Sequence, residues 1–585
     1  MKKTIIEVLK DIYNHKYSYV LRASILQLVV TTLGASLLTL LMRAILVSSD
    51  LPGLTIDNIG SFLNNPLTLG LLLGYLFVLA FLVYFEFSIL VEMVRYKETK
   101  LRLTFNRLLE DTRDFFKSLS GWHILAFLFY LILTLPFLGV IFSSALLENL
   151  YIPQFISGEL SKTVLGKLFY YSLYVFLGYL NLRFLYTLPL TVTGRGRHFG
   201  HNMAESWRLT KGRKILDFIG LAVVLLILLT VFLTLSFLGI GLASLLDSSS
   251  DNVIIETIFL SFIWGLSFVL TLIMKLASLS YLLKLLGQEV ESHQVLGISK
   301  KHTKSDLFVL GVILITIAGA RFLYTSSRVS NDTSSSPKVI GHRGFVSRGV
   351  ENSLESLDAA AKEGVDYVEL DLILSKDRQF IVCHDNNLKR LTGKNISISK
   401  SNASQVLGLK TSQNGHSSTL VSFDDYVARA KKRGVKLLVE LKPTGSEPNN
   451  YEQLFVDKLR SLGVERKYMV MSAKLATIEK VKKLDSAIQA GYAISLQIGD
   501  FTSQKVDFYA VEDFSYNEFL ANQAHKSHKK IYAWTVNSKN DIQHYLRSSV
   551  DGVITDYPNL VDDLKTQARG KKSYLYYFLN VMNLS

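Results

Sequence analysis

The chain has 585 residues, 49% of them hydrophobic, and a formal net charge of +15 at pH 7, which excludes a single ordinary soluble domain. Its one cysteine, Cys383, excludes a disulfide within the chain. The positive charge would suit a nucleic-acid-binding protein. The basic residues, however, gather at the ends of long apolar segments, so we predict no nucleic-acid partner. The apolar segments stop near residue 325, which indicates a membrane region followed by a water-soluble one.

Residues 1–324 are predicted to form an α-helical polytopic membrane domain. No short apolar core with a cleavage site follows the N-terminus, so we expect the first apolar stretch to remain as an anchor. A helix of about 20 apolar residues is long enough to cross a bilayer. By this criterion the sequence predicts seven spans, at 23–47, 66–94, 121–147, 167–193, 215–245, 253–286 and 307–324.

Lysine and arginine alternate sharply between the segments that connect these spans. They are frequent in the N-terminal segment and after the second, fourth and sixth spans, whereas 48–65 and 246–252 have none and 148–166 has only Lys162. Because basic residues stay on the cytoplasmic side during insertion, we expect a cytoplasmic N-terminus and an extracytoplasmic C-terminal domain. The shortest span, 307–324, decides this topology, since the C-terminal domain would be cytoplasmic if that span did not cross.

Three charged residues lie deep within predicted spans: Glu86, Arg183 and Lys275. A charge in hydrocarbon is costly, so such side chains either pair inside the helix bundle or line a polar path. Residues 201–214 contain a basic amphipathic pattern with Trp207, which is typical of a helix lying along the inner membrane surface.

The soluble region is predicted to be an α/β TIM-type (β/α)8 barrel over residues 338–568, after a flexible Ser-rich linker at 325–337. Short apolar strands that alternate with helices indicate a parallel sheet, and eight such repeats favour closure. An open doubly wound sheet is the structural alternative. The predicted strands are 338–343, 367–374, 436–442, 468–473, 491–496, 508–513, 531–536 and 551–556.

Polar side chains lie within or directly after several apolar runs in the first half of the predicted barrel. They are His342, Arg343, Glu369, Asp371, His384, Glu440 and Lys442. Residues two apart on a strand point to the same face, as Glu369 and Asp371 do. The C-terminal ends of barrel strands form a single rim, where we expect the seven side chains to meet.

This combination of side chains favours phosphodiester cleavage. Carboxylate oxygens without cysteine suit Mg²⁺ or Ca²⁺, which neutralises phosphate oxygens. Two histidines can divide the roles of general base and general acid, while an arginine and a lysine hold phosphate oxygens. Each residue alone has a plainer explanation, such as a turn, a solvated strand face or a surface ion pair. The prediction therefore depends on their joint placement.

Five motifs carry a resemblance to a known family. They are GHRG (341–344), ENSLES (351–356), YVELDLILSKD (367–377), FIVCHDNNLKRLTG (380–393) and LLVELK (437–442). With YAWTVN (532–537) and DGVITDYP (551–558), residues 338–568 resemble the glycerophosphodiester phosphodiesterases. The preceding helices look like the membrane domain of a bacterial subset of that family.

The resemblance implies a role for each matched residue. Metal ligands would be Glu369, Asp371 and Glu440; the acid–base pair would be His342 and His384; the phosphate contacts would be Arg343 and Lys442. Glu351 would lie close by, as a further ligand or as a group behind the ligands. The chain departs from the family pattern only in loops and supporting positions, at Val350, Ser353 and Arg378.

The leading hypothesis is metal-dependent hydrolysis of glycerophosphodiesters, giving glycerol 3-phosphate and an alcohol, at the extracytoplasmic membrane surface. The substrates would be deacylated phospholipids, lysophospholipids or a polyglycerolphosphate polymer. The alternative is a lipid-binding or transport protein whose barrel binds without hydrolysis. The C-terminal tail, 569–585, is expected either on the membrane or beneath the barrel, and the sequence indicates no oligomeric state.

Overall fold

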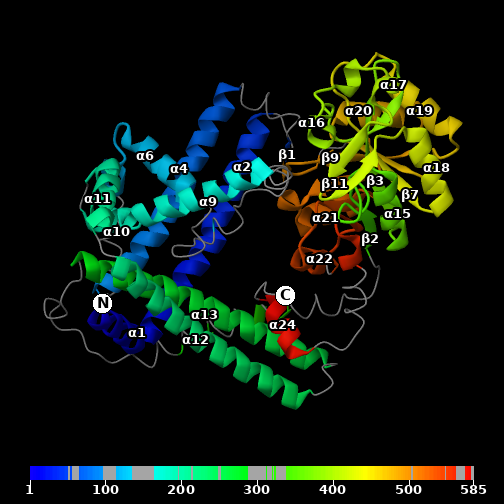
Figure 1. Ribbon diagram of the computed structural model, residues 1–585. Coiled ribbons are helices and arrows are strands. Elements are labelled where there is room, and N and C mark those ends of the chain that lie inside the picture. The colour runs from blue at the N-terminus through cyan, green and yellow to red at the C-terminus, as the bar shows by residue number, and fades with distance from the viewer. Residues whose placement is uncertain are drawn as a thin grey trace.

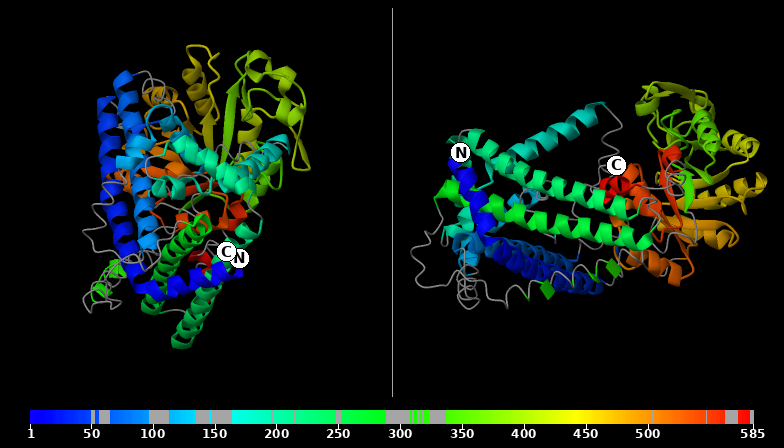
Figure 2. Two further views of the ribbon diagram at one scale, coloured as in Figure 1. Left: turned by 90° about the vertical axis from the view of Figure 1, so that its left-hand side faces the viewer. Right: turned by 90° about the horizontal axis from the view of Figure 1, so that it is seen from below.

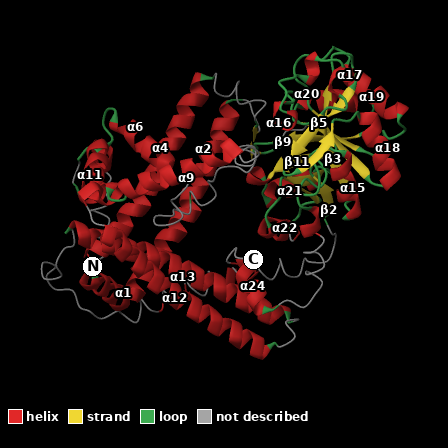
Figure 3. Cartoon of the chain, viewed as in Figure 1, coloured by secondary structure: helices red, strands yellow, loops and turns green. Residues whose placement is uncertain are grey.

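The structure is a computed structural model, and it describes most of the chain. The described residues are 1–49, 53–55, 65–96, 113–134, 146, 164–194, 197–212, 215–247, 252–287, scattered positions between 308 and 323, 337–501, 505–546, 548–561 and 573–581. Helices make up the N-terminal part, while the strands gather in the C-terminal part (Figure 1, Figure 3).

Long helices dominate the N-terminal part. They are α1 (Lys2–Val29), α2 (Ala35–Ser48), α4 (Pro66–Tyr96), α6 (His123–Thr134), α9 (Val164–Arg183), α10 (Thr187–Thr193), α11 (Phe199–Gly212), α12 (Ile215–Leu246) and α13 (Val253–Leu286). A π-helical turn at Val30–Gly34 joins α1 to α2. The longest two, α12 and α13, run side by side (Figure 2).

Five described stretches are long and apolar enough to cross a membrane: Lys2–Ser48, Pro66–Arg95, Val164–Thr193, Asp217–Leu246 and Ile254–Leu286. They overlap the predicted first, second, fourth, fifth and sixth spans, and the first stretch begins at Lys2, well before the predicted start at residue 23. Only the first half of the predicted third span is described, as α6. The predicted seventh span, 307–324, lies largely outside the described residues.

The three charged side chains deep within the spans have polar contacts inside the bundle. Lys275 Nζ lies 3.5 Å from Glu86 Oε1, with both side chains almost fully buried. A guanidinium nitrogen of Arg183 donates to the backbone oxygen of Trp207 at 2.7 Å, and the guanidinium lies over the Trp207 ring at 4.4 Å. Pairing lowers the cost of placing charge away from water, which supports the internal-pairing interpretation for Glu86 and Lys275. The predicted amphipathic helix at 201–214 is observed as α11.

Eight parallel strands close into a barrel, as predicted. They are β2 (Lys338–Gly341), β3 (Tyr367–Leu374), β7 (Lys436–Leu441), β8 (Met469–Ser472), β9 (Gln489–Ile494), β11 (Phe508–Glu512), β12 (Lys530–Trp534) and β13 (Gly552–Thr555). Their order is β2-β13-β12-β11-β9-β8-β7-β3, and β2 also pairs with β3. That last pairing closes the circle and excludes the open doubly wound sheet.

Helices surround the strands, and local sequence sets their ends. They are α15 (Leu354–Lys362), α18 (Phe423–Arg433), α19 (Tyr451–Ser461), α20 (Leu475–Leu484), α21 (Glu518–Lys526) and α22 (Lys539–Leu546). Ser353 caps α15 through the Ser356 amide, and Ser422 caps α18 through the Asp425 amide. Gly434, at φ +70°, ends α18, because glycine adopts the left-handed conformation without strain. The apolar faces of these helices and the outer faces of the strands form the main core.

Alternation along the strands positions the candidate site. The inner face carries a smaller apolar cluster that includes Tyr367 of β3 and Leu438 of β7. Successive inward positions on a strand lie two residues apart, so Glu369 and Asp371 follow Tyr367, and Glu440 follows Leu438. The β3–β7 register sets Asp371 opposite Glu440. The carboxylates therefore lie above the apolar interior, toward the C-terminal rim.

Smaller elements extend this rim. The short strand β4 (Phe380–Val382) pairs antiparallel with β3. A hairpin of β5 (Lys410–Gln413) and β6 (His416–Thr419) turns at Asn414 and Gly415, both at positive φ.

Described contacts join the helical part both to the barrel part and to the C-terminal tail. Strand β1 (Gly53–Leu54), after α2, pairs with β10 (Ile498–Gly499), after β9. The C-terminal helix α24 (Tyr574–Val581) packs against α12 and α13 (Figure 2). The tail was expected on the membrane or beneath the barrel. Its described part packs against α12 and α13, and the Gln543 side chain of barrel helix α22 donates to Tyr576 of the tail.

Candidate active site

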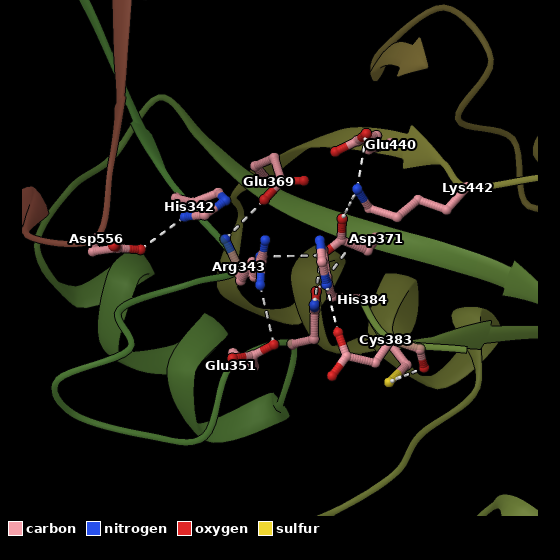
Figure 4. A network of polar contacts seen from close by, with 12 residues as sticks. His342, Arg343, Glu351, Glu369, Asp371, Cys383, His384, Glu440, Lys442 and Asp556 are labelled. Carbon is pink, nitrogen blue, oxygen red and sulfur yellow. Dashed lines mark hydrogen bonds and ion pairs between the residues drawn. The ribbon is translucent and has the colours of Figure 1, made fainter. Parts of the chain in front are cut away.

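The seven polar residues singled out in the sequence lie together at the C-terminal rim of the barrel (Figure 4). Glu369 and Asp371 come from β3 and Glu440 from β7, and one oxygen from each lies within 4.8 Å of the others. His342 and Arg343 directly follow β2, Lys442 follows β7, and His384 follows β4. The strand register is what brings these distant parts of the chain together.

Asp371 is the most heavily contacted of the three carboxylates. Its oxygens lie 3.2 Å from Lys442 Nζ and 3.3 Å from Arg343 Nε. The Asn352 side chain donates to it at 2.8 Å and accepts from its backbone amide at 3.1 Å. Burial raises the pKa of Asp371, but the charges of Lys442 and Arg343 outweigh burial and hold this pKa well below its usual range. The carboxylate is therefore ionised.

Glu369 has a different environment. Its Oε2 accepts the backbone N–H of Arg343 at 2.9 Å, whereas its Oε1 is buried and has no hydrogen-bond partner among the described residues. Burial, together with the charges of Asp371 and Glu440, raises the pKa of Glu369 well above its usual range. An ionised Glu369 thus needs an additional positive charge.

These observations fit a hard divalent cation. Three carboxylate oxygens converge, no sulfur lies among them, and oxygen ligands are those that Mg²⁺ and Ca²⁺ prefer. A cation beside Glu369 would satisfy its buried Oε1 and offset the repulsion among the three carboxylates. The residues present therefore fit the predicted metal group.

His342 is held by a carboxylate that the sequence analysis did not assign. His342 Nδ1 and Asp556 Oδ1 lie 2.8 Å apart, and the Asn537 side chain donates to Asp556 Oδ2 at 2.6 Å. Burial raises the pKa of Asp556, but the His342 imidazole beside it lowers this pKa below the usual value. An ionised Asp556 accepts the Nδ1 proton, which leaves Nε2 as the nitrogen that exchanges protons.

His384 has a matching carboxylate partner. Its Nδ1 lies 2.7 Å from Asp385 Oδ1, while Arg390 Nε donates to Asp385 Oδ2 at 2.6 Å. Burial raises the pKa of Asp385, but hydrogen bonds from His384 and Arg390 bring it down to about 2. Each histidine therefore has an acidic partner at Nδ1.

Glu351 lies behind the site. Its carboxylate accepts from Arg390 at 2.5 and 2.8 Å, from Gln413 at 2.6 Å and from Arg343 at 3.2 Å. It does not belong to the group of converging carboxylates. Of the two predicted positions for Glu351, the contacts favour the one behind the ligands, where it fixes the guanidinium of Arg343.

Six residues of this network were not assigned a role from the sequence: Asn352, Asp385, Arg390, Gln413, Asn537 and Asp556. Asn352 and Arg390 lie within quoted motifs, but neither position alone predicts a partner. Gln413 precedes an Asn-Gly pair, a strong signal for a two-residue hairpin turn. That signal would have placed β5 and β6, but not their contact with the site.

Comparison with known proteins identifies both parts of the chain. Residues 5–322 match the family described as the membrane domain of glycerophosphoryl diester phosphodiesterase. Residues 342–560 match the glycerophosphoryl diester phosphodiesterase family. The first match covers more than half of the chain.

Individual relatives align mainly with the barrel part. The putative glycerophosphodiester phosphodiesterase YhdW of Bacillus subtilis is 24% identical over 237 residues, covering 38% of this chain and 96% of the relative. Human lysophospholipase D GDPD1 is 47% identical over 62 residues, covering 11% of this chain and 20% of the relative.

Solved structures also align with this part. An Oleispira antarctica phosphodiesterase in complex with the product sn-glycerol-3-phosphate is 21% identical, with a TM-score of 0.35, over 39% of this chain and 97% of that one. The two family matches cover the helical part and the barrel part in turn. The chain therefore belongs to the glycerophosphoryl diester phosphodiesterase family, as a membrane-domain member, and is a membrane-bound phosphodiesterase.

Proposed function

We propose that the protein hydrolyses glycerophosphodiesters in a metal-dependent reaction, releasing glycerol 3-phosphate and an alcohol at the extracytoplasmic face of the membrane. The observation that carries this proposal is the convergence of Glu369, Asp371 and Glu440 beside two histidines that each have a carboxylate at Nδ1. The proposed division of the chain is a membrane domain at 1–324, a linker at 325–337, a barrel at 338–568 and a tail at 569–585.

The three converging carboxylates are the proposed ligands of the cation, Mg²⁺ or Ca²⁺. A bound cation would neutralise charge on the phosphate oxygens and the negative charge that develops as the ester bond breaks. Glu369 and Asp371 are fully buried, which keeps the ligands in a fixed geometry. Asn352 holds Asp371 from behind through two hydrogen bonds.

His342 and His384 are the proposed acid–base pair. Both side chains are partly exposed, so both can reach a substrate at the rim. One imidazole takes the proton of the attacking oxygen, which comes from water or from a glycerol hydroxyl of the substrate. The other imidazole gives a proton to the alkoxide that leaves phosphorus. Asp556 and Asp385 stabilise whichever imidazole carries the second proton.

Arg343 and Lys442 are the proposed phosphate contacts. Lys442 Nζ lies close to both Asp371 and Glu440, at 3.2 and 3.0 Å, so its charge faces the carboxylate group. Arg343 is almost fully buried and is held by Glu351 and Asp371. Arginine offers a planar pair of donors and lysine a point charge, and together they can hold oxygens that the cation does not reach.

The extracytoplasmic location is supported by charge and by contact. The loops 48–65 and 246–252 lack lysine and arginine, which is typical of outer loops. The barrel part touches the helical part beside loop 48–65, through β10 with Leu54, and the C-terminal tail touches it beside loop 246–252, through Tyr574 with Asp247. A barrel on the cytoplasmic side would be attached to the basic segments instead.

The direct test is a hydrolysis assay with the purified full-length protein. We expect release of glycerol 3-phosphate from a panel of glycerophosphodiesters, with loss of activity in EDTA and in the variants His342→Ala and His384→Ala. The exposed substitution Asp457→Ala serves as the matched control and is expected to keep full activity. Full activity of both histidine variants, or binding of these compounds without product, would contradict the proposal and favour a barrel that only binds.

A further inference from the structure

The barrel part and the helical part share a small two-stranded sheet. Strand β1 pairs antiparallel with β10, with Gly53 opposite Gly499 and Leu54 opposite Ile498. These are backbone pairings between a loop after α2 and a loop after β9. The barrel is thus joined to the helical part by direct pairing as well as by the chain connection.

The β10 side of this sheet belongs to the rim that carries the site. Strand β9 ends at Ile494 and β10 begins at Ile498, so β10 follows the C-terminal end of a barrel strand. The Gln497 backbone amide donates to Ser515 Oγ at 2.9 Å, just after the end of β11. The Gln497 side chain donates to the backbone oxygens of Gly499 and Asp500. These bonds hold the β10 loop to the rim.

The other side of the sheet belongs to the membrane helices. Leu54 is buried with Ile45 and Leu46 of α2, and Ile498 packs against this cluster together with Leu72 and Tyr75 of α4. The last turn of α2 and the first turns of α4 flank loop 48–65, which has no basic residue. Ile498 of the barrel is therefore seated at the outer ends of two membrane helices.

Lipid-facing surface lies directly beside this seat. Val47 at the end of α2 and Leu67 at the start of α4 are 75% and 62% exposed. Large exposed apolar side chains on membrane helices face hydrocarbon or the interface. The catalytic rim thus lies next to the outer surface of the bilayer.

The C-terminal helix gives a second, independent attachment on the outer side. Tyr574 of α24 is buried, packs edge-on against Phe259, and donates to Asp247 Oδ2 at 2.9 Å. Asp247 follows α12, in the loop 246–252, which contains no lysine or arginine. The Gln543 side chain, on barrel helix α22, donates to Tyr576 Oη at 3.0 Å. Two attachments restrain the barrel better than a single tether.

We infer that the β1–β10 sheet holds the catalytic rim against the outer leaflet, and that the enzyme acts on phosphodiesters still anchored there by an apolar chain. The lysophospholipid class fits this description, with its glycerophosphodiester head at the rim and its acyl chain beside α2 and α4. The inference rests on the proposed function and narrows its substrate class. A freely diffusing glycerophosphodiester gains nothing from this placement, because its approach does not depend on the orientation of the barrel.

The test measures hydrolysis by the full-length enzyme in phosphatidylcholine nanodiscs. The substrates are pairs that share a head group, and only one member of each pair carries an acyl chain. The anchored substrates are lysophosphatidylglycerol and lysophosphatidylethanolamine, and the soluble ones are glycerophosphoglycerol and glycerophosphoethanolamine. Leu54→Asp breaks the apolar seat from the membrane side and leaves the barrel sequence intact; Leu54→Ile is the conservative control. We expect Leu54→Asp to lower kcat/KM on the anchored substrates on the order of tenfold, with kcat/KM on the soluble ones retained.

Three results would overturn the inference. They are an equal loss on both substrate types, no loss on either, or a wild-type enzyme that prefers the soluble substrates. A wild-type enzyme that hydrolyses neither type would instead overturn the proposed function itself. A second readout is a disulfide between the cysteines of Leu54→Cys/Ile498→Cys in membranes. Its absence would show that the two strands do not meet.

Discussion

At the scale of single residues, the two histidines are equivalent in geometry but differ in their surroundings. Asp556 is held by Asn537, an uncharged amide, whereas Asp385 is held by Arg390. A positive neighbour keeps a carboxylate ionised at lower pH than a neutral amide does. The carboxylates fix the Nδ1 tautomer in both cases, so their removal should affect catalysis without removing a reacting atom.

Asp556→Asn tests this orienting role. We expect kcat to fall on the order of a hundredfold with KM nearly unchanged, because an amide can present its NH₂ to Nδ1 and so favour the wrong tautomer. The measurement is a kcat and KM comparison with wild type. Asn537→Ala should show a smaller loss, and Asp457→Asn, on an exposed helix face, none. A loss confined to KM would contradict the orienting role.

The substitution Asp385→Asn is expected to lower the stability of the protein by an amount that depends on pH. The folded-state pKa of Asp385 is about 2 against an ordinary value of 3.8, so ionised Asp385 contributes about 2 kcal/mol to the free energy of unfolding. The ionised carboxylate stabilises the folded state at pH values above its ordinary pKa. This stabilisation is lost as the pH falls through the folded-state pKa. The difference in Tm between wild type and Asp385→Asn should therefore be largest near pH 7 and shrink below pH 4. A difference that grows on acidification would contradict this sign.

At the scale of elements, the barrel strands could be predicted from the sequence, whereas the short strands β1 and β10 and the contacts of the β5–β6 hairpin could not. Strand β3, YVELDLIL, is an apolar run interrupted only by the site carboxylates, and it is fully buried as a strand. Strands β1 and β10 have two residues each, too short for any periodic pattern. They exist only because residues far apart in the sequence meet. The same holds for Gln413, whose hairpin has a local turn signal but whose partner, Glu351, is set by the tertiary fold.

The turn between β3 and β4 gives a prediction at this scale. Arg378 has φ +62° at the position where the family pattern has a glycine, and its side chain is exposed. A side chain in the left-handed region is strained. Arg378→Gly should therefore raise the free energy of unfolding by up to about 1 kcal/mol, measured as an increase in Tm. Arg378→Ala keeps the Cβ and should bring no such gain; an equal gain would assign the effect to the charge instead.

At the scale of the whole molecule, the charge pattern of the loops and the contacts of the barrel both support the proposed extracytoplasmic location of the barrel. The sequence predicted the side of the membrane from lysine and arginine alone. It did not predict that the barrel touches the ends of α2 and α4 beside loop 48–65, because Ile498 lies in a loop with no distinguishing pattern. The predicted seventh span, 307–324, links the two parts and lies largely outside the described residues, so the topology stays a prediction.

Cysteine labelling tests this topology in intact cells. Native Cys383 is buried, and burial raises its pKa to about 12, so it should react poorly with maleimides. Lys526→Cys, on barrel helix α21, should react with a membrane-impermeant maleimide before permeabilisation. Lys211→Cys, on α11, should react only afterwards. The reverse order would place the barrel in the cytoplasm.

The central claim is that Glu369, Asp371 and Glu440 hold a divalent cation on which hydrolysis depends. The most direct measurement is cation binding and activity of the EDTA-treated full-length enzyme during titration with Mg²⁺ or Ca²⁺. We predict that wild type binds the cation and regains activity in parallel, whereas Glu369→Gln does neither. Full activity of metal-free wild type, or cation binding by Glu369→Gln as tight as in wild type, would contradict the claim.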